Sequence, residues 1–460
     1  MSRIVRNDPY LTREDTGADQ GRSPAIQHYE KQDGSDGATS NTVFTLSKPY
    51  VQGSNTLMVF INGQKAELLV SASNETEYEE TSSSTITFGA SLLDTDVVEF
   101  MIVGTYFIQD TDIYVTKSLE KNPNIIINGD FDIWQRGTSF AAIASSTFTA
   151  DRFSYQFNIS SVHTLTRNTS VPTFAESGHT SNYSLRLDVT TADAAIADNE
   201  LNIIRYVVEG HDAAAIYGKS ATLSFWVKAT KTGTHCVSFT TDIATARSYV
   251  AEYTISAADT WEKKTITVLF NDSVGTWDTT TGKGIKIHFG LAVGADYQTT
   301  ADSWQTGAFL GTSNQVNVLD STDNDFSLSQ VKLEVGQIAT PFVPRPFAEE
   351  LALCQRYFES SYNQGVPPGT ATADAQRLKW ASYVSIYIRS KFSSEKRAVG
   401  TGYVYSPISG TVGTFYDWSA TADDNTDVSV AVSTSGIECK NSSVTDNHLY
   451  GVHWAVDAEL

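Results

Sequence analysis

The sequence has few cysteines, and it lacks any long apolar run. Only three cysteines occur in 460 residues, Cys236, Cys354 and Cys439, too few and too dispersed for a disulfide framework or a zinc site. We interpret them as small buried apolar groups. No run of about 20 apolar residues exists, and the N-terminus lacks the apolar core of a signal peptide. We therefore expect no membrane insertion, and a chain made and folded in a cytoplasm.

Clustered positive charge and catalytic motifs are also missing. The chain has 32 basic and 53 acidic residues, for a net charge of -21, and a nucleic-acid groove needs clustered Lys and Arg. No His-Glu-x-x-His, Gly-x-Ser-x-Gly or phosphate-binding loop occurs. The short repeats of a glycan-degrading β-helix are absent too. We expect neither nucleic-acid binding nor enzymatic activity, and we assign no catalytic residue.

The residues that are abundant indicate an all-β fold. Charged residues make up 18% of the chain and aromatic residues 11%, and Thr, Ser and Gly are frequent, as in β-sandwiches with polar turns. A chain of 460 residues exceeds what one hydrophobic core usually serves, so two to four domains are expected. The prediction is a set of tandem β-domains with one short helix.

The chain is organised around the stretch from Asn124 to Gly137. Three consecutive isoleucines, an Asn-Gly pair and spaced aromatic residues predict a buried strand, a tight turn and a second strand. Asn128, Asp130 and Asp132 carry closely spaced oxygen atoms, which suit either a calcium ion or a solvated Asx turn. Both interpretations stay open.

Residues before this stretch divide into three predicted segments. Residues 1–40 are polar and turn-rich, and they form either a disordered tail or an extended arm that becomes ordered on a partner. Period-2 alternation over residues 41–108 predicts a small β-sandwich, in which Asn62-Gly63 forms a type I′ hairpin turn. Residues 109–123 are predicted to be a linker.

Three further segments follow. Alternation over residues 124–340 predicts two packed sheets, whose last strand would bring Asp323 and Asp325 near Asp130 and Asp132. Residues 341–365 are predicted to contain a proline linker and a helix near 347–362, and residues 366–460 a β-rich C-terminal tip. The helix has a seam typical of a coiled coil, although it could instead pack on its own domain. The seam residues are Phe347, Leu351, Cys354 and Phe358.

Several short motifs resemble those of phage tail fibres and related virion appendages that contain a carbohydrate-binding-like jelly roll. They are Asn128-Gly129-Asp130-Phe131, Trp134-Gln135-Arg136-Gly137, Ala150-Asp151-Arg152-Phe153, Leu223 to Lys228, Phe326 to Gly336, Glu350 to Glu359 and the Asp-Ala-Glu-Leu ending. The resemblance implies a homotrimer in the virion whose residues 1–40 attach to tail, baseplate or neck proteins. It also raises the expectation of a structural calcium ion; no other cofactor is expected.

The resemblance further implies binding to host-surface polysaccharide. Sugars offer an apolar face and hydroxyl groups, so exposed aromatic side chains beside polar groups are candidates for contact. The competing interpretation of each aromatic is that it caps a core, and the competing functions are a purely structural fibre or a glycan-degrading tailspike. The glycan-binding candidates are Trp277, Trp304, Tyr403, Tyr405, Tyr416 and Trp418.

Overall fold

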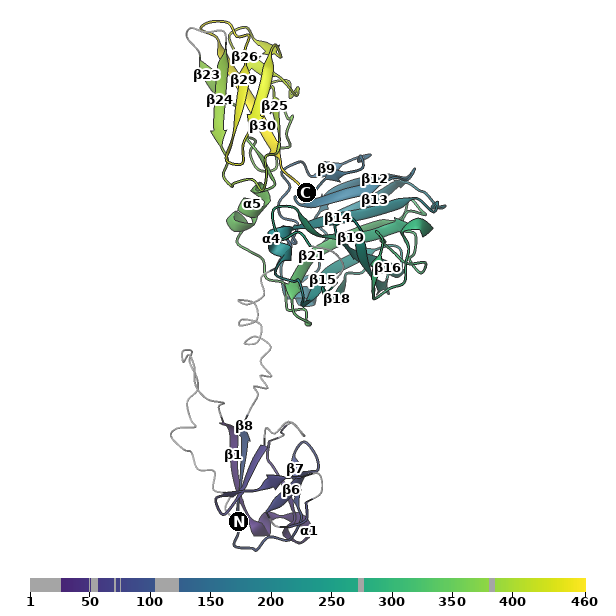
Figure 1. Cartoon of the computed structure of the whole chain (residues 1–460), viewed down its shortest axis with the longest axis vertical. Helices are drawn as coiled ribbons and strands as arrows, with labels where there is room; N and C mark the ends of the chain where they lie inside the picture. Colours follow the sequence, from purple (N-terminus) through teal and green to yellow (C-terminus); the bar gives the residue numbers. More distant parts are fainter. Residues whose placement is uncertain are drawn as a thin grey trace. The chain divides into compact units, whose positions relative to one another are not determined.

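Figure 1 shows a computed structural model of the chain. It describes residues 26–48, 50, 57–69, 72–74, 76–103, 124–271, 277–379 and 385–460. The chain forms two compact units, Met1–Tyr114 and Val115–Leu460. Both are built from β-sheets, which confirms the all-β prediction. None of the helices in the described residues is long and apolar enough to span a bilayer.

The first unit contains two four-stranded sheets around an aromatic core. Phe44 and Phe88 pack edge to face with ring centroids 5.6 Å apart, and Asn62 and Gly63 have the predicted positive φ angles of 49° and 83°. Two short helical segments, η1 (Gly34–Asp36) and α1 (Ala38–Asn41), precede β2. The sheets have the orders β1 (Ile26–Asp33), β8 (Val97–Val103), β3 (Leu57–Ile61), β4 (Gln64–Lys65), and β2 (Val43–Thr45), β7 (Thr85–Phe88), β6 (Glu77–Glu80), β5 (Glu67–Leu68).

The N-terminal sandwich begins earlier than the sequence predicted. Strand β1 falls within residues 1–40, the predicted arm, and pairs antiparallel with β8 from Asp33 back to Ile26. This pairing covers the backbone donors and acceptors along one edge of β8, which would otherwise form a sheet edge. The remainder of the predicted arm, residues 1–25, and the predicted linker, residues 109–123, lie outside the described residues.

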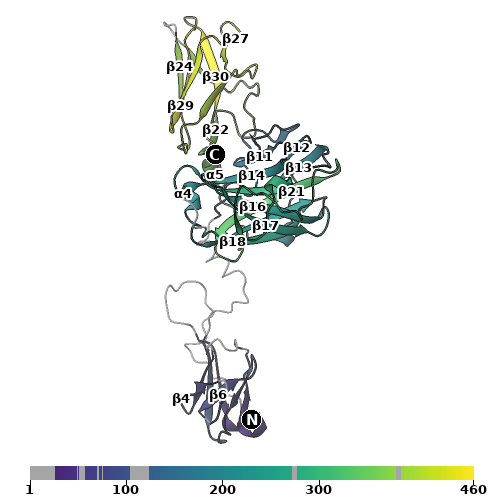
Figure 2. The same cartoon turned by 45° about the vertical axis from the view of Figure 1, so that its right-hand side comes forward.

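Two larger sheets form a jelly roll in the second unit (Figure 2). The seven-stranded sheet has the order β10 (Thr147–Phe148), β11 (Phe153–Phe157), β14 (Leu201–Glu209), β19 (Lys283–Val293), β16 (Gly233–Thr240), β17 (Arg247–Ile255), β20 (Trp304–Thr306). The six-stranded sheet has the order β18 (Glu262–Leu269), β15 (Ser220–Ala229), β21 (Asp325–Val335), β13 (Ser184–Thr191), β12 (Val162–Asn168), β9 (Ser139–Phe140). The short helices are α3 (Phe174–Ser177), α4 (Gly210–Ala213) and η2 (Ala295–Tyr297).

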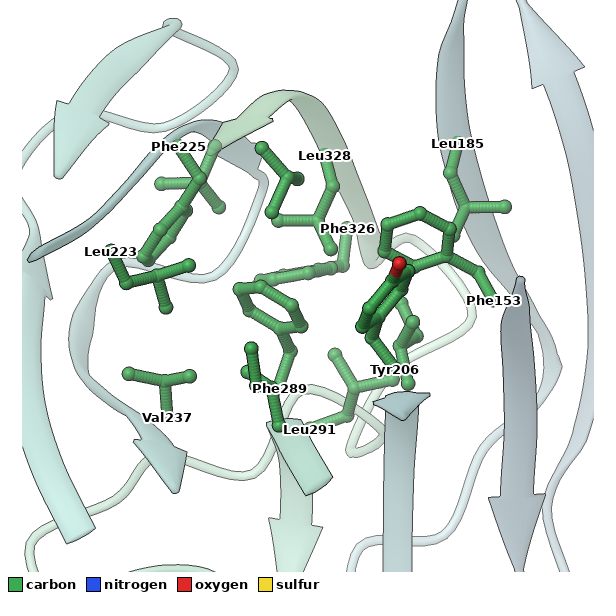
Figure 3. Close-up of a cluster of buried hydrophobic side chains, with 14 of the residues drawn as sticks. Phe153, Leu185, Tyr206, Leu223, Phe225, Val237, Phe289, Leu291, Phe326 and Leu328 are labelled. Carbon is green, nitrogen blue, oxygen red and sulfur yellow. The ribbon is translucent and has the colours of Figure 1, made fainter. Parts of the chain in front are cut away.

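The jelly-roll core lies between these sheets and consists of alternate residues from facing strands (Figure 3). Phe225 on β15 packs edge to face on Phe289 of β19, with ring centroids 5.1 Å apart. Phe153 on β11 packs against Tyr206 on β14, with ring centroids 5.0 Å apart. The residues between these core residues on each strand point away from the core, because successive strand residues face opposite sides of the sheet.

The predicted strand–turn–strand over Asn124–Gly137 is wrong, because this stretch contains no strand. Asn128 has a φ of 60°, and its side-chain amide donates to the carbonyls of Ile133 and Asp151 while its oxygen accepts from the Ile133 N–H. The Ile127 N–H donates to the Tyr206 hydroxyl at 2.8 Å. Side chains therefore satisfy the buried backbone groups that a sheet ladder would otherwise satisfy.

The C-terminal part of the second unit contains helix α5 (Phe347–Gln355) and two further sheets. Its central strand β30 (Leu449–Asp457) pairs with β22 (Phe358–Ser360), β23 (Gln376–Lys379), β25 (Thr401–Tyr405) and β26 (Phe415–Asp417), and β26 pairs with β27 (Ala422–Asp424). The smaller sheet has the order β24 (Ile386–Lys391), β29 (Gly436–Asn441), β28 (Val428–Val432).

Candidate functional site

The predicted calcium ligands separate into two groups. Asp130 accepts a hydrogen bond from the Ser181 hydroxyl at 2.6 Å and lies 2.7 Å from His179 Nε2. Asp325 binds Arg186 Nε at 2.9 Å and accepts from the Thr230 hydroxyl at 3.2 Å. Asp325 lies six residues before Val331, the β21 residue that contacts Gly129, and this separation corresponds to roughly 20 Å along a strand.

The predicted convergence of Asp130 and Asp132 with Asp323 and Asp325 is therefore wrong. The side chain of Asn128 forms hydrogen bonds with the backbone of Ile133, as the side chain in an Asx turn does with nearby backbone groups. Across the described ranges, no group of three or more His, Cys, Asp or Glu residues could hold a metal ion. The geometry gives no support to a calcium site built from these five residues.

Asp130 and Asp132 instead line a small pocket beside the proline-rich segment. Burial raises the pKa of the Asp132 carboxyl; a hydrogen bond from Asn182 opposes this shift, and nearby Asp130 and Glu350 add to it. The Phe347 side chain is 54% exposed at this pocket. The pocket is lined by Asn124, Asn128, Gly129, Asp130, Asp132, Phe342, Val343, Pro344, Arg345, Phe347 and Glu350.

The predicted trimer seam does not form one exposed stripe. Helix α5 ends at Gln355, and Phe358 belongs to β22, which pairs with β30. Cys354 is fully buried in a cluster with Ile127, Ile133, Val207, Tyr357 and Leu460, and Leu351 packs against it. The helix thus packs on its own chain, the alternative left open by the sequence, and of the four seam residues only Phe347 is exposed.

A buried ionic cluster joins the C-terminal residues to the jelly roll. Arg152 forms an ion pair with Glu459, and its guanidinium lies 3.4 Å from the centroid of the Tyr357 ring. Arg136 binds both Asp151 and Asp457 at 3.1 Å. Burial alone would lower the pKa of Arg152, but Glu459 raises it, so the guanidinium stays charged.

A second ion pair also links the jelly roll to the C-terminal part of the chain. Glu209, at the end of β14, binds Arg356 at 2.6 Å and accepts a hydrogen bond from the Tyr357 hydroxyl at 2.5 Å. Arg397 donates to the carbonyls of Ala458 and Thr281. Several of the motifs behind the tail-fibre resemblance, including Trp134–Gly137, Ala150–Phe153, Glu350–Glu359 and the C-terminal tetrapeptide, therefore meet in a structural joint.

The structure brings Trp277 and Trp304 together, although the sequence analysis named them as separate candidates. Their ring centroids are 5.7 Å apart, and Trp304 Nε1 donates to the Leu269 carbonyl at 2.9 Å. The ring centroid of Tyr217 lies 4.5 Å from that of Trp277, and the ring centroid of Tyr249 lies 5.7 Å from that of Trp304. Both tryptophans are half-buried against the jelly-roll core, so much of their area serves packing.

Trp418 and Tyr416 form a different cluster in the C-terminal sheets. Their ring centroids lie 4.9 Å apart, and the Arg377 guanidinium lies 3.7 Å from the Trp418 ring centroid. A Cβ atom on Gly451 would lie 2.8 Å from Trp418 Nε1, so glycine allows the indole to lie against β30. A cation already occupies one face of Trp418, which leaves this ring poorly suited to stacking on a sugar.

Tyr403 and Tyr405 give the best exposed aromatic surface of the six candidates. They are two residues apart on β25, and the intervening Val404 points into the core, so both tyrosines face away from it. Tyr403 is 40% exposed, whereas Tyr405 is half-buried. Burial raises the pKa of Tyr405 to about 12, which keeps its phenol protonated and able to donate a hydrogen bond.

Residues that the sequence did not single out support this tyrosine pair. Tyr362 lies 6.1 Å from Tyr405 in edge-to-face geometry and stacks on His453 at 4.0 Å. The exposed carboxylate of Asp423 accepts hydrogen bonds from the hydroxyls of Ser406 and Ser409, both at 2.5 Å. Tyr362 contacts Tyr405, and Asp423 contacts Ser406, only through the folding of the sheets, so no local pattern could have identified them.

Comparisons with known proteins return distant structural likenesses. One is the enzymatically active domain of tailspike protein 4 from bacteriophage CBA120, with 13% identity, a TM-score of 0.26, and coverage of 46% of this chain and 21% of that chain. A second is a family 11 carbohydrate-binding module from Clostridium thermocellum in complex with a mixed-linked tetrasaccharide, with 10% identity, a TM-score of 0.24, and coverage of 44% and 98%.

A third is the CBM22-1–GH10 part of xylanase 10B from Clostridium thermocellum, complexed with xylohexaose, with 13% identity, a TM-score of 0.23, and coverage of 46% and 30%. This chain thus spans about a fifth of the tailspike chain that it matches. No protein-family model and no curated protein matches the sequence. All three TM-scores are below 0.5.

Proposed function

We propose that this protein is a component of a phage tail fibre or a related virion appendage, and that it binds host-surface glycan without cleaving it. The observation that carries the proposal is the outward-facing pair Tyr403 and Tyr405 on β25; the exposed Asp423 carboxylate is hydrogen-bonded to Ser406, the residue after Tyr405. Aromatic faces contact the apolar side of a sugar ring, and neighbouring carboxylates accept hydrogen bonds from its hydroxyls.

The position of the tyrosine pair suits this role. Tyr362 and His453 form a stacked, buried pair beside Tyr405, so the ring is held before a ligand arrives. A preorganised ring loses less conformational entropy on binding than a mobile one. One stacked ring contributes only about 1 kcal/mol beyond its buried area, so a single site binds weakly.

The remaining parts of the proposal come from the sequence resemblance. We propose a homotrimer, in which three weak sites act together and raise the apparent affinity by roughly 10² or more. Residues 1–40 are proposed to attach to tail, baseplate or neck proteins, although strand β1 shows that part of this range also serves the N-terminal sandwich.

A purely structural fibre is the second candidate, and one observation favours it. Trp277, Trp304, Tyr416 and Trp418 are engaged in packing or cation–π contacts. A fibre without receptor binding would leave Tyr403 and Tyr405 as ordinary surface residues of a sheet. The two candidates therefore differ in whether the tyrosine surface has a ligand.

The proposal can be tested with the full-length protein and a panel of immobilised bacterial surface polysaccharides. Bound protein and newly released reducing ends are measured in the same wells. Saturable binding to at least one polysaccharide without release of reducing ends is the expected result. Absence of binding across the panel and to intact bacteria favours the structural fibre, and release of reducing ends would show an enzyme.

A further inference from the structure

A row of polar side chains crosses the outer face of the seven-stranded jelly-roll sheet. Arg205 on β14 is directly opposite His288 on β19, and His288 is directly opposite Ser238 on β16. Directly opposite residues on neighbouring strands point to the same side of a sheet. The flanking residues on each strand, such as Ile204 and Phe289, belong to the core, so this row faces away from the core.

Each residue of this row has a buried polar atom without a protein partner. These atoms are Arg205 Nε, His288 Nδ1 and Ser238 Oγ. The side-chain amide nitrogen and oxygen of Gln315, which lies against Gly290, are also buried without a protein partner. Native structures rarely bury polar atoms unsatisfied, because the lost hydration is unfavourable, so such atoms indicate bound water or a ligand.

The charge around Arg205 is positive, although the chain is strongly acidic. Arg205 forms no ion pair with any described residue, while Lys286 and Lys283 share the single carboxylate of Asp242 at 2.6 and 4.0 Å. Glu459 also acts on Arg205 but is itself paired with Arg152 and Arg136, which leaves Asp242 to balance Arg205, Lys283 and Lys286 in a chain whose net charge is -21. Such a group favours an anionic ligand.

Other parts of the chain pack on the outward-facing residues of β14 on either side of Arg205, but they do not bury Arg205 completely. Ile203, two residues before it, packs under Leu310, and Val207, two residues after it, packs under Cys354 and Leu460. Arg205 itself is half-buried between these covered positions, with its Nε atom inaccessible. His288 bonds Thr240 through Nε2 at 2.8 Å, which leaves Nδ1 for another partner.

We propose that Arg205 binds the carboxylate of an acidic sugar residue, a uronic acid, and that bound water links hydroxyl groups of the same sugar to the buried Nδ1 atom of His288. A guanidinium binds a carboxylate through two parallel hydrogen bonds. One unpaired arginine beside neutral hydrogen-bonding groups suits a ligand with a single negative charge and several hydroxyls better than it suits a phosphate dianion. Water between the sugar and the deeper Ser238 and Gln315 atoms would satisfy those groups.

This site takes its biological setting from the proposed glycan binding, but it lies on the jelly roll and shares no residue with the tyrosine surface. The two proposals can therefore fail separately. Tyr403→Ala should leave uronate binding at Arg205 unchanged, and Arg205→Gln should leave any neutral glycan that binds at Tyr403 unaffected.

The test is calorimetric titration of the full-length protein with sodium glucuronate, glucose and inorganic phosphate. Glucuronate should bind, glucose should not, and Arg205→Gln should weaken glucuronate binding tenfold or more. Arg167→Gln is the matched control, because Arg167 is a half-buried arginine on the other jelly-roll sheet, and its replacement changes the net charge equally. It should bind glucuronate like the unmodified protein.

Three results would overturn the assignment: equal binding of glucose and glucuronate, unchanged glucuronate affinity in Arg205→Gln, or Arg205-dependent binding of phosphate alone. If Arg205→Gln fails to fold, NMR of the ring ¹⁵N nuclei of His288 in the unmodified protein provides the test. Those signals should shift with glucuronate and stay unchanged with glucose, and the absence of a shift with glucuronate rejects the site.

Discussion

Arg152 and Glu459 are 307 residues apart in the sequence, yet they form a buried ion pair in which both side chains are almost fully inaccessible. Arg152 lies in the jelly roll directly before β11, and Glu459 follows the central strand of the C-terminal sheets. The pair therefore ties the last residues of the chain to the strand region that follows the Asn124–Gly137 stretch. Its removal should affect the stability of the whole second unit.

We expect Glu459→Gln to lower the free energy of unfolding by about 3–5 kcal/mol, because it leaves the Arg152 guanidinium buried without its counter-charge. Chemical denaturation of the full-length protein measures the change. Glu438→Gln is the matched control, since its partner Arg389 is 74% exposed, and it should cost at most about 1 kcal/mol. Equal losses in the two variants would show that the buried pair has no special role.

Gly129 should tolerate alanine less well than Gly178, although Gly178 has the left-handed φ of 76°. A Cβ atom on Gly129 would lie 2.0 Å from the Val331 carbonyl oxygen, so strand β21 would have to move. Gly178 has open space around it, and alanine there costs only about 1 kcal/mol of backbone strain. Thermal unfolding of both variants gives the order, and a larger loss for Gly178→Ala would contradict the proposed packing.

Acidification should destabilise the fold through its buried histidines. Burial lowers the pKa of His163 to about 4, whereas histidine in an unfolded chain titrates near 6.5. Between these values the unfolded state binds more protons, so the contribution of His163 is fully present above pH 6.5 and is lost as the pH falls to 4. The loss amounts to roughly 3 kcal/mol at pH 4.

Comparison with a variant isolates this effect, because Asp151 acts in the opposite direction. Burial raises the pKa of Asp151 to about 7, against the opposing effect of Arg136, so its contribution falls as the pH rises toward 7. His163→Gln should therefore flatten the rise in unfolding free energy between pH 4 and 6.5. Replacement of the exposed His211 by Gln should leave that slope unchanged, and identical slopes for all three proteins would refute the assignment.

The proposed trimer should not depend on the predicted helical seam. We expect light scattering of the full-length protein to give three times the chain mass of 50.2 kDa. Phe347→Ser should give the same mass, because Cys354 and Phe358 are buried within their own chain and cannot form a coiled-coil stripe with Phe347. A monomeric mass for the unmodified protein would refute the trimer, and a monomeric variant would restore the seam.

Strands were predictable wherever local alternation reflects a buried face. The segments around Leu185, Leu223, Ile287 and Leu328 alternate in the sequence, and all four belong to strands that pack in the jelly-roll core. A prediction of this kind needs only the period-2 geometry of a strand. The same holds for the Asn62-Gly63 turn, whose positive φ angles those two residues favour.

The errors occurred where distant residues decide the local structure. The isoleucines of Asn124–Gly137 form no strand, because the side chain of Asn128 and the Tyr206 hydroxyl satisfy backbone groups in this stretch. Phe358 leaves the helical pattern because β22 pairs with β30, almost 100 residues later. Likewise, no spacing in the sequence shows that Trp277 meets Trp304, since tertiary packing brings them together.

We propose that the tyrosine surface of the C-terminal sheets, formed by Tyr403 and Tyr405, binds glycan. Tyr403→Ala and Tyr387→Ala form a matched pair, because the two tyrosines are 40% and 39% exposed and lie on different sheets of the same region. The measurement is the affinity of each full-length variant for the polysaccharide that the unmodified protein binds. Tyr403→Ala should weaken binding about tenfold or more, as expected for loss of a stacked ring in each of three copies, while Tyr387→Ala should bind normally. Equal affinities for Tyr403→Ala and the unmodified protein would contradict the claim.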